Sequence, residues 1–319
     1  MNEERARMVD KSDVEAAAAL IAGRVRQTPV LTVDGGEFGV PGRLSLKLEL
    51  LQHAGSFKPR GAFNRMLQGP LPEAGVLAAS GGNHGLAVAY AARALGVPAE
   101  VFVPVTASPV KVERLASLGA QVRQVGRHYA EALAASSRRA EETGALVVHA
   151  YDQPEVVAGQ GTVGRELERQ LDGIDTVLVA VGGGGLVSGI ATWFDGGVRV
   201  VAVEPEPIPT LHSALKAGRP VDVEVGGIAT DSLGARRIGE IAFDTARRTG
   251  LLSVLVRDED LVRARRLLWS ELRVAAELGG AAALAALIGG AYVPRQGERV
   301  AVIVCGGNTD PGDLATRPN

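Results

Sequence analysis

The chain has 319 residues, of which 46% are hydrophobic and 22% are charged, and its formal net charge is −2. This composition is typical of a globular protein, and the near-neutral charge excludes the strongly basic surface that attracts nucleic acid. The single cysteine excludes an internal disulfide, and no apolar stretch reaches the roughly 20 residues that cross a membrane. Because no signal peptide is evident, we expect a cytoplasmic protein whose partner is a small molecule.

The predicted elements begin with a helix that opens at a capping box in residues 12–15 and ends near Arg26. Alternation of apolar and polar residues over 44–50 then predicts a strand buried on one face. Apolar segments and helical patterns alternate along the rest of the chain. Strands are predicted at 76–79, 100–104, 121–125, 145–149, 176–181, 199–203, 252–256 and 300–304, and helices at 84–95, 110–118, 129–142, 156–171, 210–217 and 260–277.

This alternation predicts an α/β fold, because strands separated by helices form parallel sheets with helices on both faces. Two successive series indicate two doubly wound domains with mostly parallel sheets. We expect a smaller domain at residues 71–148, inserted between two parts of a larger one at 1–70 and 149–319. The glycine-rich segment 221–242 predicts no clear element.

Three glycine-rich turns follow predicted strands. They read SGGNHG at 80–85, VGGGGLVSG at 181–189 and CGGN at 305–308. Ligands of doubly wound sheets bind at the carboxyl ends of the strands. One such turn is weak evidence, since tight turns need glycine anyway, but three indicate a shared crevice.

The tetraglycine at residues 182–185 predicts a phosphate cradle. Glycines let the backbone approach a ligand, and the helix that starts near Leu186 directs free N–H groups toward it. No Gly-Lys-Ser/Thr follows, so the turn is not a P-loop, and the dinucleotide fingerprint is incomplete. The turn therefore fits one phosphate monoester, with a plain tight turn as the alternative.

Lys58 stands between Phe57 and Pro59 in the run GSFKPRGA. Most lysines are solvated surface charges. An amine in a partly apolar crevice instead has a lowered pKa and becomes a nucleophile toward an aldehyde. An aldehyde cofactor with a single phosphate is pyridoxal 5′-phosphate, so we predict that Lys58 holds this cofactor, with Phe57 packed near its ring.

The motifs GSFKPRGA, SGGNHG, AGQGT, VGGGGLVSG and VIVCGGN occur in the order seen in the serine/threonine dehydratases of pyridoxal-phosphate fold type II. The resemblance extends from about residue 26 to residue 308. The lysine motif looks more like the dehydratase and serine racemase branch than the cysteine synthase branch.

The resemblance implies a role for each matching residue. Lys58 bonds covalently to the cofactor aldehyde and, once the substrate releases it, acts as the base at Cα. Cys305 faces the pyridine nitrogen, although it could equally be a small core residue, and His84 could be a capping or packing residue. The implied cofactor-binding residues are Phe57, Lys58, Asn83, Gly182, Gly183, Gly184, Gly185, Glu277 and Cys305, and the implied substrate-binding residues are Ser80, Gly82, Asn83 and His84.

A neutral thiol does not keep the ring nitrogen protonated, which disfavours a long-lived carbanion and favours β-elimination. We therefore expect dehydration and deamination of a small β-hydroxy amino acid, such as L-threonine or L-serine, to a 2-oxo acid and ammonia. The alternatives are a dehydratase of a larger β-hydroxy amino acid, a β-replacement synthase, a racemase, or a non-catalytic amino-acid-binding protein. Relatives of this type are commonly homodimers.

Two departures from the family pattern refine these expectations. Gly81 stands where the racemases carry a second serine, which argues against racemisation. Glu204 matches one ligand of the metal-dependent relatives, but Thr210 replaces their aspartate, so we predict no metal site. We also expect no isoleucine feedback, because the biosynthetic regulatory domain does not follow residue 308.

Overall fold

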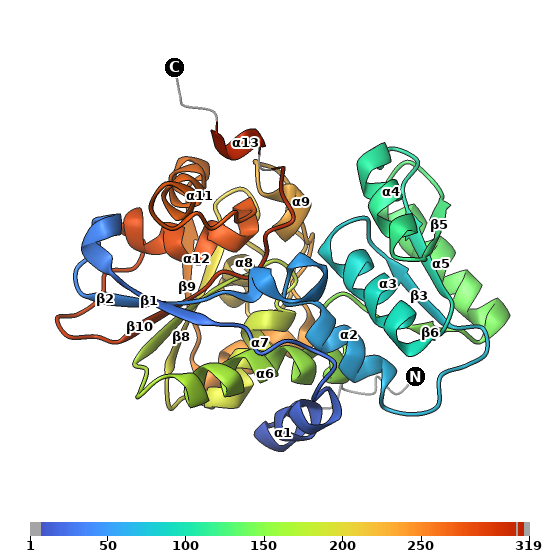
Figure 1. The fold of residues 1–319 in the computed structure, drawn as a ribbon, viewed down its shortest axis with the longest axis horizontal. Coiled ribbons are helices and arrows are strands. Elements are labelled where there is room, and N and C mark those ends of the chain that lie inside the picture. Colours follow the sequence, from blue (N-terminus) through green and yellow to red (C-terminus); the bar gives the residue numbers. More distant parts are fainter. Residues whose placement is uncertain (1–7, 311, 316–319) are drawn as a thin grey trace.

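The computed structural model describes residues 8–310 and 312–315, and its strands form two separate sheets (Figure 1). The larger sheet has the strand order β1-β2-β10-β7-β8-β9, and only β1 and β2 pair antiparallel. Its central strands β10, β7 and β8 are almost entirely buried, as expected where helices cover both faces, whereas the edge strands β1 and β9 are largely half-buried or exposed. They are β1 (Val30–Asp34), β2 (Arg43–Lys47), β7 (Thr176–Ala180), β8 (Arg199–Pro205), β9 (Leu252–Val256) and β10 (Val300–Ile303).

Helices cover the larger sheet from both sides. In Figure 1, α1 (Lys11–Leu20), α6 (Pro154–Gln170) and α7 (Gly185–Phe194) lie below it, and α11 (Asp258–Leu272) and α12 (Leu278–Ile288) lie above it. The remaining helices of this part pack around them. They are α8 (Thr210–Ala217), α9 (Thr230–Leu233), α10 (Glu240–Thr249) and α13 (Gly312–Ala315).

The smaller sheet is fully parallel, with the order β5-β4-β3-β6. Its side chains alternate between two cores: Val76 and Ala78 pack toward α3, whereas Leu77 and Ala79 pack toward α5. All four strands lie within residues 71–148, and we propose this segment as the smaller domain. The elements are β3 (Val76–Ala79), β4 (Ala99–Val103), β5 (Gln121–Gln124), β6 (Leu146–Val147), α3 (Asn83–Leu95), α4 (Pro109–Ser117) and α5 (Tyr129–Thr143).

Helix α2 (Pro59–Met66) joins the two sheets, because it packs on α6 of the larger one and on α3 of the smaller one. Its contact with α6 is backbone to backbone. An added Cβ at Gly159 would lie 2.6 Å from the Arg60 carbonyl oxygen, and one at Gly61 would lie 2.8 Å from the Val156 carbonyl oxygen. The glycines of the AGQGT motif therefore serve helix packing. This close contact fixes Lys58, which directly precedes α2.

The structure confirms the predicted α/β class with two mostly parallel sheets, but it moves several boundaries. The first helix begins at Lys11, where Asp10 rather than Ser12 is the cap, and it ends at Leu20. The strand predicted over 44–50 ends at Lys47, because a 3₁₀ turn (Glu49–Leu51) follows. The helix predicted over 260–277 is wrong beyond Leu272.

The physical reason for that last error is a single residue. Arg273 has a left-handed φ of +56°, which ends α11, and a separate helix, α12, starts at Leu278. This break is functionally important, because it turns Glu277 away from a continuous helix. The sequence patterns do not predict strand β1 or helix α10. Helix α10 begins inside the glycine-rich segment 221–242, for which the sequence predicts no clear element.

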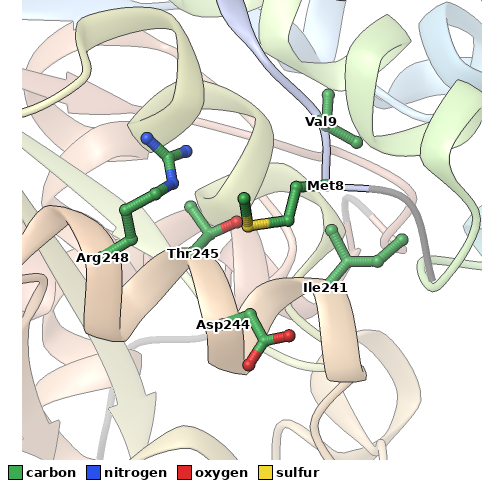
Figure 2. Close-up of a pocket in the computed structure, with 6 residues that line it drawn as sticks. All are labelled: Met8, Val9, Ile241, Asp244, Thr245 and Arg248. Atoms are coloured by element: carbon green, nitrogen blue, oxygen red, sulfur yellow. The ribbon is translucent and has the colours of Figure 1, made fainter. Parts of the chain in front are cut away.

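The first described residues pack on α10. Val9 is buried in a cluster that includes Ile241, and Figure 2 shows Met8 lying over α10 beside Thr245 and Arg248. This apolar contact fixes the start of α1 against the larger domain. Within the described ranges, no helix combines the length and apolar character that a membrane span needs.

Candidate active site

The three glycine-rich turns and the lysine turn meet at one cavity. Strands β7 and β10 are neighbours in the larger sheet, so their carboxyl ends lie side by side, and the turn after β3 approaches from the smaller sheet. The empty space at this point, its open mouth included, measures about 470 Å³. The predicted residues that line it are Phe57, Lys58, Asn83, Gly182, Gly183, Gly184, Gly185, Glu277 and Cys305.

Lys58 directs its amine into this cavity from the start of α2. The Nζ atom donates to the Ala150 carbonyl oxygen at 2.6 Å and lies 5.1 Å from the centre of the Phe57 ring. Burial lowers the pKa of the amine to about 8, although Cys305 and Glu277 act in the opposite direction. A substantial neutral fraction at physiological pH makes this amine a nucleophile.

The tetraglycine turn is held by the protein through its carbonyl groups. Thr210 Oγ1 donates to the Gly182 oxygen at 2.8 Å, and the Gly239 N–H donates to the Gly183 oxygen at 3.1 Å. Helix α7 starts at Gly185, and the first N–H groups of a helix have no intrahelical acceptor. Gly184 has a φ of +92°, which disfavours any side chain there. The turn thus has the form of an anion-binding helix start.

Glu277 and Cys305 lie on the larger-sheet side of the cavity. Glu277 precedes α12, and burial raises its pKa to about 7 while Oε1 accepts from Asn83 Nδ2 at 2.6 Å. Cys305 follows β10 and donates from Sγ to the Gly279 carbonyl oxygen at 3.5 Å. Burial raises the pKa of the thiol far above its usual value, so Cys305 stays neutral.

The turn after β3 divides its residues between two surroundings. Asn83 and Gly82 line a second cavity of about 390 Å³, which shares Asn83 and Glu277 with the first. Ser80 lies at the edge of this turn, where its Oγ accepts from the Gly82 N–H at 3.2 Å. His84 is buried away from both cavities, with Nε2 2.8 Å from the Val148 carbonyl oxygen.

The surroundings of His84 favour the packing interpretation. Burial, together with the charge of Lys58, lowers its pKa to about 3, so the ring is neutral at physiological pH. A neutral ring whose Nε2 donates to Val148 connects α3 to the chain segment that follows β6. The roles of Ser80 and His84 toward a substrate therefore stay predictions.

Sequence reasoning missed Tyr151, Ser232 and Leu233, which also line the first cavity. Tyr151 follows the carbonyl that accepts from Lys58, and its ring lies so close to Gly183 that an added Cβ would overlap it. Ser232 and Leu233 belong to α9, inside the segment that predicted no element. No local pattern marks any of them, because chain segments distant in sequence bring them to the site.

Glu204 serves as a helix cap. Its carboxyl group lies 2.9 Å from Thr210 Oγ1 and accepts from the Leu211 and His212 N–H groups at 2.7 and 2.8 Å, at the start of α8. Thr210 thus completes the cap at the position where metal-dependent relatives carry an aspartate. Over the described part of the chain, no three potential metal-ligating side chains of His, Cys, Asp or Glu cluster together.

A family model described as "Pyridoxal-phosphate dependent enzyme" matches residues 21–306. The chain belongs to this family. It is 35% identical to an L-threonine ammonia-lyase of Thermotoga maritima over 95% of this chain and 76% of that protein. It is 37% identical to a phenylserine dehydratase of Ralstonia pickettii over 96% and 95% of the two chains.

Among solved structures, a threonine deaminase of T.th. superposes with a TM-score of 0.88 at 36% identity, covering 97% of this chain and 100% of that one. These relatives confirm fold type II and pyridoxal phosphate as the cofactor of this pyridoxal-phosphate-dependent enzyme. When bound, this cofactor supplies an aldehyde that bonds to an amine and a ring that withdraws electrons.

The residues of the cavity fit this cofactor. A nucleophilic amine, an aromatic side chain and a glycine turn at a helix start lie around one space, as an aldehyde, a ring and a phosphate require. The turn itself has no room for side chains, since a Cβ at Gly184 would overlap Ala242. We propose that Lys58 holds the aldehyde, Phe57 the ring and residues 182–185 the phosphate.

The lowered pKa of Lys58 predicts how cofactor loading depends on pH. Only the neutral amine attacks an aldehyde, so the rate of loading rises as pH rises through the amine pKa, with a midpoint at about 8 rather than 10.5. Visible absorbance after mixing cofactor-free protein with pyridoxal phosphate measures this rate. Nα-acetyl-lysine amide in the same buffers is the control for the ionisation of the cofactor itself. A midpoint near that of the free amine contradicts the prediction.

Proposed function

We propose that the protein dehydrates and deaminates a small β-hydroxy amino acid, with L-threonine or L-serine as substrate. The observation that supports this proposal most directly is that the Lys58 amine, whose pKa is lowered, lines the same cavity as the un-ionised thiol of Cys305. Removal of the Cα proton and loss of the β-hydroxyl as water leave an enamine, which hydrolyses to a 2-oxo acid and ammonia. The names of the threonine ammonia-lyase and threonine deaminase relatives support this reaction.

Each residue has a distinct task in this proposal. Lys58 takes the Cα proton, since its amine is the base inside the cavity. Cys305 would face the pyridine nitrogen of the bound cofactor as a neutral group, which would not keep that nitrogen protonated. The turn after β3 receives the substrate carboxylate through Ser80, Gly82 and Asn83, while His84 packs behind it against the Val148 carbonyl, and Glu277 holds the Asn83 amide.

A larger β-hydroxy amino acid is the second candidate. The phenylserine dehydratase relative matches this chain over almost the full length of both proteins. The second cavity, which shares the lining residues Asn83 and Glu277 with the first, offers space for a bulkier β-substituent. Both candidate functions use the same elimination step, and they differ only in the size of the β-substituent that the second cavity accommodates.

Release of 2-oxo acid from L-serine, L-threonine and phenylserine, assayed side by side on the cofactor-loaded enzyme, tests the proposal. We expect turnover of at least one of the small substrates, with kcat/KM highest for serine or threonine. Preference for phenylserine would select the second candidate. Formation of D-amino acid, or of product only with an added nucleophile, would instead identify a racemase or a β-replacement synthase.

We also propose a cytoplasmic homodimer. The free thiol of Cys305 agrees with a reducing compartment, and enzymes of the dehydratase branch are commonly dimers. Light scattering of the purified enzyme measures the oligomeric state, and a mass near the 33.0 kDa of one chain contradicts the dimer.

A further inference from the structure

A line of side-chain hydrogen bonds connects α4 of the smaller sheet to the cofactor cavity. Arg114 donates from Nη2 to Asn308 Oδ1 at 2.6 Å. Asn308 donates from Nδ2 to Asn83 Oδ1 at 2.6 Å, and Asn83 donates from Nδ2 to Glu277 Oε1 at 2.6 Å. Four segments distant in sequence thus form one unbroken line across the second cavity.

The two ends of this line determine the orientation of the two amides. An asparagine amide presents an oxygen on one side and an NH₂ group on the other, and these have nearly the same size. A guanidinium only donates, so Asn308 must direct its oxygen toward Arg114 and its NH₂ toward Asn83. Asn83 must then direct its oxygen toward Asn308 and its NH₂ toward Glu277.

Glu277 alone does not fix this direction. Its pKa of about 7 means that the carboxyl group is partly protonated at neutral pH, and a protonated carboxyl can donate as well as accept. Burial raises this pKa most, the Asn83 bond and the charges of Arg114 and Lys58 lower it, and Asp231 raises it. The Arg114 guanidinium can only donate, so its end of the line has a fixed direction.

Asn308 also contacts the lysine turn. Its Nδ2 donates to the Ala54 carbonyl oxygen at 2.8 Å, and the Gly307 N–H donates to the Gly55 oxygen at 2.9 Å. A reversed Asn308 amide would lose both the Ala54 and the Asn83 bonds. The orientation of this one amide therefore affects the turn before Lys58 and the turn after β3 together.

We propose that Arg114 is a positioning residue, which orients Asn308 and through it the Asn83 amide where the cofactor and substrate cavities meet. Arg114 itself lines only the second cavity and acts on the first through these two amides. The proposal rests on the proposed function, because it places Asn83 between the cofactor and a substrate carboxylate.

Three variants test the proposal: Arg114→Met removes the charge and the donors, Arg114→Lys keeps a donor-only cation, and Arg138→Met removes an exposed arginine on α5 as the matched control. The first readout is the absorption spectrum of the cofactor-loaded protein without any amino acid, titrated across the Glu277 pKa. The second readout is the KM and kcat for the preferred amino acid. Loss of the Arg114 charge shifts the titration by itself, so the KM and the part of the shift that depends on Asn308 report the orientation of the amides.

For Arg114→Met we expect the spectral transition to move to higher pH, because loss of a positive charge raises the pKa of Glu277 further. We expect KM to rise about tenfold, the effect of one misaligned hydrogen bond, and kcat to change less. Arg114→Lys should return both the titration midpoint and KM close to the values of the unchanged enzyme. In an Asn308→Ala background, Arg114→Met should add little to the rise in KM and should shift the titration only by the loss of its charge, because the two residues otherwise act through one another.

Arg114→Met contradicts the proposal if its titration and KM match those of Arg138→Met, or if Arg114→Lys is as impaired as Arg114→Met. If Asn308→Ala does not fold, the KM values of the two single Arg114 variants still test the proposal. The spectral readout needs no turnover. A titration shift that shrinks in the Asn308→Ala background, in a protein that eliminates water from no amino acid, would therefore overturn the proposed function and support the positioning role.

Discussion

Replacing Lys58 with alanine is expected to remove the visible absorbance of the cofactor-loaded protein and to lower kcat by about 10³-fold or more. The reason is that one amine has two tasks, covalent attachment of the cofactor and removal of the Cα proton, and general base catalysis alone contributes about 10²–10⁴-fold. In the described structure, Lys58 is the only lysine among the residues that line the cofactor cavity. Absorbance and 2-oxo acid release measure the two tasks separately.

Two further variants make this experiment decisive. Lys58→Arg keeps the positive charge but supplies no nucleophilic amine, and we expect it to be as inactive as Lys58→Ala. Lys216→Ala removes an exposed lysine on α8 and should change neither absorbance nor turnover. Elimination of water by Lys58→Ala at a rate near that of the unchanged enzyme would show that another group is the base.

Replacing Arg60 with methionine is expected to lower the free energy of unfolding by about 3–5 kcal/mol, although Arg60 lies outside the cavity. Arg60 binds both carboxylate oxygens of Glu49, at 2.8 and 2.7 Å, and one oxygen of Glu166 at 3.0 Å. Lys47 donates to the other Glu166 oxygen at 2.5 Å. Arg60, Lys47 and Glu49 are at most 1% exposed, so loss of Arg60 leaves a buried carboxylate without its main partner.

Urea unfolding at one fixed concentration of pyridoxal phosphate measures this effect, because bound cofactor shifts apparent stability. Arg65→Met is the matched control on the same helix. Arg65 contacts Glu155 at 3.4 Å with both side chains partly exposed, and such pairs contribute at most about 1 kcal/mol. Equal losses in the two variants would contradict a special role for the buried cluster.

The order of elements was predictable because it depends on local pattern. Apolar segments separated by helical patterns predict a doubly wound α/β fold wherever they occur, and strands β3 and β9 coincide with their predicted bounds. The predicted ends of helices were wrong where a single residue caps or terminates the helix. The left-handed φ of Arg273 ends α11, and the Asp10 side chain rather than Ser12 caps α1. Neither effect is visible in periodicity.

The motif GSFKPRGA shows where sequence reasoning about the site ended. It predicted Lys58 and Phe57 as cofactor residues, and both line the cavity. It did not predict that Arg60, two residues after Lys58, points into a buried ion cluster, or that Gly61 permits the close contact with α6. One short run thus combines residues of the site with residues that support it.

The sequence by itself determined the chemistry available to this protein: an amine beside an aromatic residue, a glycine turn at a helix start and a thiol after the last strand. It could do so because these groups lie on short runs whose local conformation depends on neighbouring residues. Only the tertiary structure decided the partners of each group, among them Tyr151 against the glycine turn and the line from Arg114 to Glu277. Those contacts join residues up to 225 positions apart, and hydrogen bonds across such separations exist only after the two sheets have packed.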